Sequence, residues 1–109
     1  MKIRNWTFVS PAAEREFKDL PLKIQERFLL DLQAIAMGSR PFSSLESLKT
    51  IGSGVIELRK NGSPAYRCVY VAKHNETVYV LHSFAKTTNG VDRKAMATIA
   101  SRYSEIPKD

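Results

Sequence analysis

Basic side chains interrupt otherwise apolar segments in the second half of the chain. Arg59, Arg67 and Lys86 each stand within or at the end of a run of apolar, β-branched and aromatic residues, which predicts a strand. From a sheet they can project toward a polyanion, where such cations neutralise the charge that develops on a phosphate during cleavage. RNA supplies its own nucleophile, the 2′-hydroxyl, so a protein needs only to position the phosphate and move protons. These residues therefore fit phosphodiester cleavage without a metal.

Each candidate also has a structural interpretation. Arg67 either contacts a phosphate or serves as a structural partner of Glu57. Arg59 is a phosphate contact or a salt-bridge residue, and Lys86 is a phosphate contact or a solvated charge at the end of a strand. His82 is a proton carrier or a hydrogen-bonded histidine of the sheet. The sequence leaves these alternatives open.

Length and composition limit the other possibilities. The 109 residues, 43% of them hydrophobic, favour one domain spanning residues 1–109. Lysine and arginine number 17 against 11 aspartates and glutamates, and the net charge of +6 favours an anionic partner such as nucleic acid, phosphate or an acidic protein. Cys68, the single cysteine, excludes an internal disulfide framework and a multi-cysteine zinc site, so we expect no metal or cofactor. Lacking a signal peptide and a long apolar run, the protein is expected in the cytoplasm, away from membranes.

The periodicity of apolar residues predicts an α+β domain with the order β-α-α-β-β-β-α. Ser10 is expected to cap the first helix, Gly38 to end the second and Asp92 to cap the last. An apolar stripe at helical spacing identifies the core face of the second helix: Ile24, Phe28, Leu29, Leu32, Ile35 and Ala36. The expected elements are a strand at 3–9, helices at 12–20 and from 21 to Gly38, strands at 55–60, 65–73 and 77–86, and a helix after Asp92.

Short turns join the last three strands, which must therefore form an antiparallel meander. The helical hairpin is expected on one face of this sheet, and the other face stays partly open unless the last helix or a partner covers it. A two-residue connection at His74 and Asn75 would pair Arg67 with His82, and a three-residue connection would separate them. Residues 39–54 are expected to form a loop whose leucines, at 45 and 48, pack on the core.

Aromatic and basic residues near these strands are candidates for contacts with RNA. The tyrosines are expected mainly to pack, although one of them is a candidate for stacking on a base. The candidate RNA-binding residues are Arg59, Tyr66, Tyr70, Arg93 and Lys94.

Three segments in order carry a resemblance to a known family. They are residues 52–59 (GSGVIELR), 66–70 (YRCVY) and 80–86 (VLHSFAK), followed by a helix that contains Ala97 and Arg102. Together they resemble the toxins of the RelE/HigB superfamily, specifically its phage-derived HigB-like branch. The N-terminal strand and helical hairpin fit the RelE-like fold of that family, so the resemblance covers nearly the whole chain.

The resemblance implies the toxin of a type II toxin–antitoxin pair. Similar proteins cut messenger RNA, usually in the ribosomal decoding site, and an antitoxin from the same operon neutralises them. Here the antitoxin is expected to be of the helix-turn-helix type. Operator DNA would be contacted only through that antitoxin. In that family the arginine at the position of Arg67 contacts the scissile phosphate, and Lys86 occupies one of the assisting basic positions. Glu57 stands where RelE has a lysine, and Thr87 stands where the branch commonly has a second basic residue. These differences make His82 or Glu57 the candidate acid–base residue.

Two other classes of function remain. A catalytically silent RelE-like protein would act by binding its antitoxin or operator DNA. An unrelated basic module would bind RNA or protein. The combination of Arg67 with Lys86 favours the RNA-cleaving toxin over the unrelated module.

Overall fold

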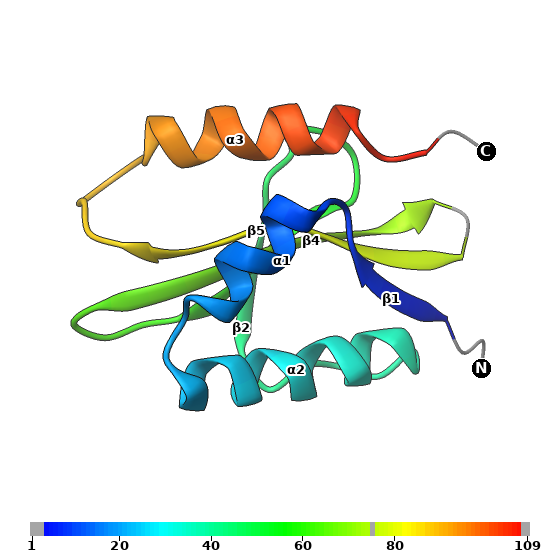
Figure 1. The fold of residues 1–109 in the computed structure, drawn as a ribbon, viewed down its shortest axis with the longest axis horizontal. Helices are drawn as coiled ribbons and strands as arrows, with labels where there is room; N and C mark the ends of the chain where they lie inside the picture. The colour runs from blue at the N-terminus through cyan, green and yellow to red at the C-terminus, as the bar shows by residue number, and fades with distance from the viewer. Residues whose placement is uncertain (1–3, 75, 108–109) are drawn as a thin grey trace.

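The computed structural model describes residues 4–74 and 76–107 and shows a mixed sheet with helices on both faces (Figure 1). Within these residues there are three helices and five strands, so the predicted α+β, RelE-like class is confirmed. No helix of this part of the chain is long and apolar enough to cross a membrane. The elements are β1 (Asn5–Phe8), α1 (Pro11–Lys18), α2 (Leu22–Ala36), β2 (Ser44–Ser47), β3 (Val55–Lys60), β4 (Ala65–His74), β5 (Thr77–Lys86) and α3 (Arg93–Ser104).

The strands lie in the order β1-β5-β4-β3-β2. The predicted antiparallel meander of β3, β4 and β5 is confirmed. The first strand was expected at residues 3–9, of which residue 3 lies outside the described residues, and β1 pairs in parallel with Thr77–Val80 of β5. The sheet is therefore mixed rather than purely antiparallel. Parallel neighbours need a long crossover connection, which the helical hairpin and the meander together supply.

Strand β2 corrects the expected order, which had a loop over residues 39–54. Residues Ser44–Ser47 pair with β3 at the outer edge of the sheet, and all of them are exposed. An exposed edge strand carries no alternation of apolar and polar residues, so its sequence does not reveal it. Leu48 packs on the core as expected, whereas the expectation for Leu45 is wrong, because this side chain is 49% exposed.

A buried carboxylate fixes the chain just before β2. Asp31 of α2 is fully buried, and its Oδ1 accepts hydrogen bonds from the backbone nitrogens of Phe42 (2.8 Å) and Ser43 (3.3 Å). The hydroxyl of Ser43 donates to Oδ2 of Asp31 and accepts from Nε of Arg27 at 3.0 Å. These bonds satisfy a carboxylate that would be costly to bury alone. They also tie α2 to the segment that leads into β2.

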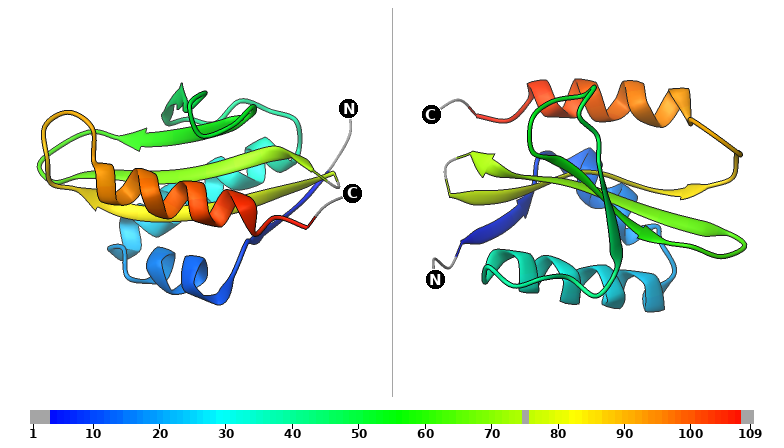
Figure 2. Two further views of the ribbon diagram at one scale, coloured as in Figure 1. Left: turned by 90° about the horizontal axis from the view of Figure 1, so that it is seen from above. Right: turned by 180° about the vertical axis from the view of Figure 1, so that it is seen from behind.

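Helices α2 and α3 lie on opposite faces of the sheet (Figures 1 and 2). An apolar cluster of buried side chains lies under each of them. The predicted stripe of α2 contributes Phe28, Leu32 and Ile35 to the first cluster, together with Phe17 of α1. Ile99 of α3 belongs to the second cluster. The last helix therefore covers the second face, which is one of the alternatives that the sequence left open.

Local signals at the helix ends act as predicted. The hydroxyl of Ser10 accepts a hydrogen bond from the backbone nitrogen of Ala13 at 3.2 Å, at the start of α1. Asp92 caps α3 in the same way, with Oδ1 accepting from the nitrogen of Ala95 at 3.0 Å. Gly38 has a φ of 80°, the left-handed conformation that commonly follows a helix.

The β4–β5 hairpin has a register that neither expected connection gives. His74 pairs with Thr77, and Asn75 between them lies outside the described residues. Arg67 consequently lies opposite Phe84, rather than opposite the histidine two positions before it. Two irregularities in the pairing shift the register along the hairpin, which the sequence alone does not reveal.

Shortening one fully buried side chain of α2 tests this packing. We expect Leu32→Ala to lower the free energy of unfolding by about 2–5 kcal/mol, because the change removes apolar contacts and leaves a cavity. Urea unfolding followed by circular dichroism measures the change. Leu30→Ala on the same helix is the matched control and should cost far less, because Leu30 is 56% exposed. Equal losses in the two variants would contradict the described core.

Candidate functional site

Two of the predicted phosphate-binding residues line one open cleft at the end of the β4–β5 hairpin. Arg67 comes from β4 and Lys86 from the end of β5, and register places Lys86 opposite Ala65. The cleft has a volume of about 600 Å³. The turn between β3 and β4 and the segment after β5 supply most of the remaining lining, including Ser63, Thr87, Thr88 and Asn89. We call this space the turn cleft.

An ion pair at the back of the turn cleft holds Arg67. Its Nε lies 3.5 Å from Oε1 of Glu57 on the neighbouring strand, the pairing that the sequence left open. Nη1 of Arg67 donates to the carbonyl of Tyr66 at 3.0 Å. Arg59 lies opposite Arg67 and also approaches Oε1 of Glu57, at 3.7 Å, while its Nη1 is 3.1 Å from Oε2 of Glu46. Glutamates and arginines therefore alternate across three neighbouring strands.

Burial works against both charges of the central pair. Glu57 is 8% exposed and Arg67 is 3% exposed. Burial raises the pKa of Glu57 above its ordinary value of 4.5, although the charges of Arg67 and Arg59 oppose the shift. Burial likewise lowers the pKa of Arg67 below its ordinary value, against the charge of Glu57. Shifts of this kind cluster at functional sites, although ion-pair networks in ordinary structure also cause them.

A second cavity adjoins the turn cleft. It has a volume of about 230 Å³ and lies between α3 and the sheet. Glu57 and Lys86 line it, as does Phe84, and Lys86 also lines the turn cleft. We call it the apolar slot, because its lining is mostly apolar.

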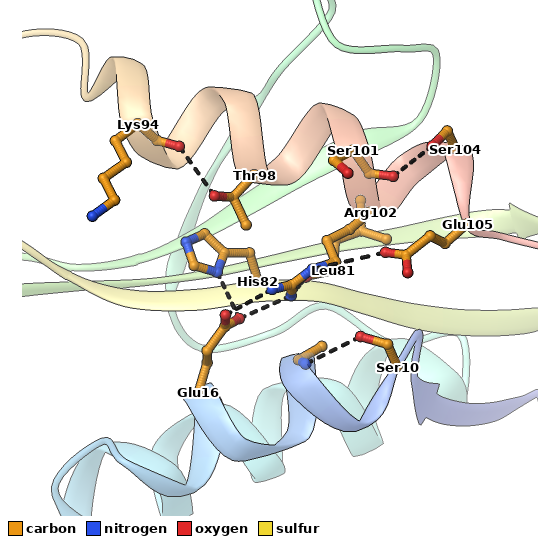
Figure 3. Close-up of polar contacts among 11 residues, drawn as sticks. Ser10, Glu16, Leu81, His82, Lys94, Thr98, Ser101, Arg102, Ser104 and Glu105 are labelled. Carbon is orange, nitrogen blue, oxygen red and sulfur yellow. Dashed lines mark hydrogen bonds and ion pairs between the residues drawn. The ribbon is translucent and has the colours of Figure 1, made fainter.

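His82, the other candidate for proton transfer, lies away from the turn cleft, in a cluster that joins α1 to α3 (Figure 3). Its Nδ1 is 2.8 Å from Oε1 of Glu16, and its ring stacks on Phe84 with centroids 4.8 Å apart. Arg102 of α3 donates to both oxygens of Glu16, at 2.9 and 2.7 Å, and to the carbonyl of Leu81 at 3.0 Å. These bonds place His82 in the hydrogen-bonded sheet position that the sequence left open.

Electrostatics strengthen this cluster. Burial alone would raise the pKa of Glu16, but the hydrogen bonds and charges of Arg102 and His82 outweigh it and lower the pKa below 4.5. The bond from Glu16 raises the pKa of Arg102 in turn. Glu16 was missed by the sequence reasoning, because no local pattern connects a glutamate on α1 with residues 66 and 86 positions further along. Its position next to the buried Phe17 is the only signal that the sequence offers.

The candidate RNA-binding residues are spread over several places. Tyr66 is half-buried and lines a cavity together with His82. Tyr70 is 6% exposed and belongs to the core cluster under α2, and burial raises its pKa to about 12. Its ring is therefore not accessible to a base, and we exclude it from the site. Arg93 and Lys94 are exposed in the first turn of α3.

No feature of the described residues points to a bound metal. Within residues 4–74 and 76–107, no group of three histidine, cysteine, aspartate or glutamate side chains is placed to hold an ion. Cys68 is fully buried, and burial raises its thiol pKa to about 12. It is a small, protonated side chain of the core.

Removing one charge from the α1–α3 cluster tests its contribution. Because the pKa of Glu16 is lowered in the fold, its stabilisation is present above pH 4.5 and is lost as the pH falls through the lowered pKa. We expect Glu16→Gln to lower the free energy of unfolding by about 1–2 kcal/mol at pH 7 and progressively less as the pH falls below 4.5. Urea unfolding across this pH range measures the difference.

Glu14→Gln, on the same helix, is the matched control. Glu14 makes an exposed pair with Lys18 at 2.9 Å, so its loss should cost less than about 0.5 kcal/mol. An unchanged stability of Glu16→Gln at pH 7 would contradict the described cluster.

Comparison with known proteins agrees with this architecture. The family described as phage-derived Gp49-like proteins (DUF891) matches residues 15–104, from within α1 to the end of α3. The match contains the turn cleft, the apolar slot and the α1–α3 cluster. No curated protein matches the chain significantly. Since the family match spans most of the sequence, the chain belongs to the phage-derived Gp49-like family, a RelE-like family associated with toxin–antitoxin systems.

Proposed function

We propose that this protein is the toxin of a type II toxin–antitoxin pair and cleaves messenger RNA on the ribosome without a metal. The observation that carries the proposal is the convergence of Arg67 and Lys86 on one polar cleft. Membership of a family associated with toxin–antitoxin systems supports the choice of partner and process. The resemblance of residues 52–102 to the HigB-like branch supports the more specific proposal that cleavage takes place on the ribosome.

The charges around the turn cleft suit a phosphate. Three cations, Arg59, Arg67 and Lys86, stand against the two carboxylates of Glu46 and Glu57, which leaves a positive excess. Among the described residues, the buried Nε atoms of Arg59 and Arg67 have no hydrogen-bond partner that meets the usual geometry. A buried guanidinium with incomplete compensation is stabilised by an anion that accepts its remaining hydrogen bonds.

The reaction follows from the chemistry of RNA. The 2′-hydroxyl loses its proton and attacks the neighbouring phosphorus, and the bond to the 5′-oxygen of the next nucleotide breaks. A cyclic phosphate and a free 5′-hydroxyl remain, with one proton removed and one delivered. Arg67 and Lys86 stabilise the charge that grows on the phosphate oxygens in the transition state.

The acid–base assignment favours Glu57 over His82. Glu57 lies 3.5 Å from Arg67 and orients it, and its raised pKa brings it closer to the range in which a carboxylate accepts protons effectively. Neither residue lines the turn cleft itself, but Glu57 pairs with Arg67 of the cleft, whereas His82 is bonded to Glu16 and lines other cavities. We therefore assign His82 to the support of α1 and α3.

The proposal also names the partners. Arg59, Tyr66, Arg93 and Lys94 are proposed to contact the RNA or the ribosome around the cleft. A protein with a net charge of +6 suits an antitoxin with an acidic segment, because complementary charge speeds encounter. Operator DNA would be bound through that antitoxin, and a neighbouring reading frame with a helix-turn-helix pattern would identify it.

Replacing Arg67 tests the function. When the protein is produced without its antitoxin, we expect growth arrest and loss of intact messenger RNA, and Arg67→Ala should slow cleavage by about 10²–10³-fold. Arg67→Lys should restore activity only in part, because an ammonium lacks the two parallel donors of a guanidinium. Lys86→Ala should slow cleavage less. Cleavage of a defined message on purified ribosomes measures each rate.

Two controls separate chemistry from folding. Arg15→Ala removes an exposed arginine of α1 with the same change in net charge, and it should cleave at the unaltered rate. Thermal unfolding of each variant identifies any that is silent because it is misfolded. If the folded Arg67→Ala protein cleaves at the unaltered rate, Arg67 has a structural role and does not act in cleavage. If the unaltered protein cleaves nothing with ribosomes present, the catalytically silent antitoxin-binding protein becomes the better account.

A further inference from the structure

The apolar slot combines the size and lining expected of a site for a small flat ligand. Its apolar walls come from the turn before β3, from β5 and from the start of α3, and comprise Leu48, Phe84, Val91, Ala95 and Met96. A volume of about 230 Å³ is below that of sites for drug-sized molecules, which suits a single ring system. Val91 at the rim is 73% exposed, so the apolar surface continues to the outside.

The slot is continuous with the turn cleft. Lys86 and Gly90 line both cavities, and Glu57 of the slot lies 3.5 Å from Arg67 of the cleft. In a nucleotide, one sugar separates the base from its phosphate, so a phosphate in the cleft brings a base to the slot. We propose that the apolar slot binds a nucleobase of the RNA whose phosphate lies in the turn cleft. This site rests on the proposed function and adds a source of base preference to it.

The polar groups of the slot indicate which bases fit. Three carboxylates, of Glu46, Glu57 and Asp92, line it with a single ammonium, that of Lys86. Carboxylates accept hydrogen bonds, and a glutamate or aspartate is a natural partner for an exocyclic amino group. Adenine, cytosine and guanine carry such a group and uracil does not. The slot therefore favours the three amino-bearing bases over uracil.

A nucleobase is a better occupant than an apolar side chain of a protein partner. The slot opens beside the cationic cleft, and the aromatic ring of Phe84 gives it a surface on which any base can stack. The carboxylates of the slot already have partners within the chain, because Glu46 and Glu57 pair with arginines and Asp92 accepts from the backbone of α3. Each can still accept a further hydrogen bond, which a base with an amino group supplies and an apolar side chain does not. If the slot binds a nucleobase, a nucleotide binds more tightly than the same sugar phosphate without its base. If the slot binds an apolar side chain, the two bind equally.

Titration with adenosine, cytidine and uridine 5′-monophosphates and with ribose 5-phosphate, followed by NMR, tests the slot without any cleavage. We expect adenosine and cytidine monophosphates to bind about tenfold more tightly than ribose 5-phosphate, and more tightly than uridine monophosphate. The backbone amide signals of Val91 and Met96 should shift with the nucleotides and not with ribose 5-phosphate.

Paired variants make the test specific. Val91→Ala should lower the ratio of adenosine monophosphate affinity to ribose 5-phosphate affinity by about threefold, because it removes part of the apolar rim. Leu22→Ala is the matched control, since Leu22 on α2 is 72% exposed and far from the slot in the sequence, and the ratio should stay the same.

Equal affinities for nucleotides and ribose 5-phosphate would contradict the proposed nucleobase site. NMR signal shifts confined to residues of the turn cleft would contradict it as well. An apolar side chain as the true occupant would give that result. Cleavage of RNA on ribosomes tests the proposed function separately. If the protein binds adenosine monophosphate in the slot but cleaves no RNA, the proposed function is wrong and the proposed nucleotide site still stands.

Discussion

The ion pair between Glu57 and Arg67 is the constraint on which the site depends. Both residues lie on central strands and are nearly buried, and the Nε atom of Arg67 is 3.5 Å from Oε1 of Glu57. Burial raises the pKa of Glu57 and lowers the pKa of Arg67, so it favours the neutral form of each side chain. Such a pair is a weak source of stability, because desolvation offsets much of its attraction. It does fix the direction of the guanidinium. Because Arg67 lies on β4 and its partner Glu57 on the paired strand β3, the guanidinium is held more firmly than it would be on a loop.

The local features of the fold were predictable, and the nonlocal ones were not. Helical periodicity identified the core face of α2, and single residues such as Ser10 and Asp92 marked helix starts. Strand β2 escaped prediction because an exposed edge strand shows no apolar alternation, and its position depends on the distant carboxylate of Asp31. The parallel pairing of β1 joins residues about 70 positions apart, and bulges in the β4–β5 hairpin shift its register without a sequence signal.

The site was predictable to the same degree. Basic residues within apolar strands drew attention to Arg67 and Lys86, and antiparallel pairing brings them to one cleft. The apolar slot was not predictable, since four separate segments form it. Nor was the role of Glu16, whose bonds to His82 and Arg102 hold α1 and α3 on either side of β5 (Figure 3). That cluster supports α3, the helix that forms one wall of the slot.

The most direct test of the account observes the Nε–H group of Arg67 by NMR while an RNA with a 2′-O-methyl group at every sugar, which cannot be cleaved, is added. The account predicts that the Arg67 signal shifts in proportion to binding and that the signal of Arg102, bonded to Glu16, stays in place. A phosphate bound to this guanidinium changes the surroundings of its Nε–H group, which has no hydrogen-bond partner of the usual geometry among the described residues. An Arg67 signal that does not move while the RNA demonstrably binds would show that the phosphate lies elsewhere, and would contradict the account.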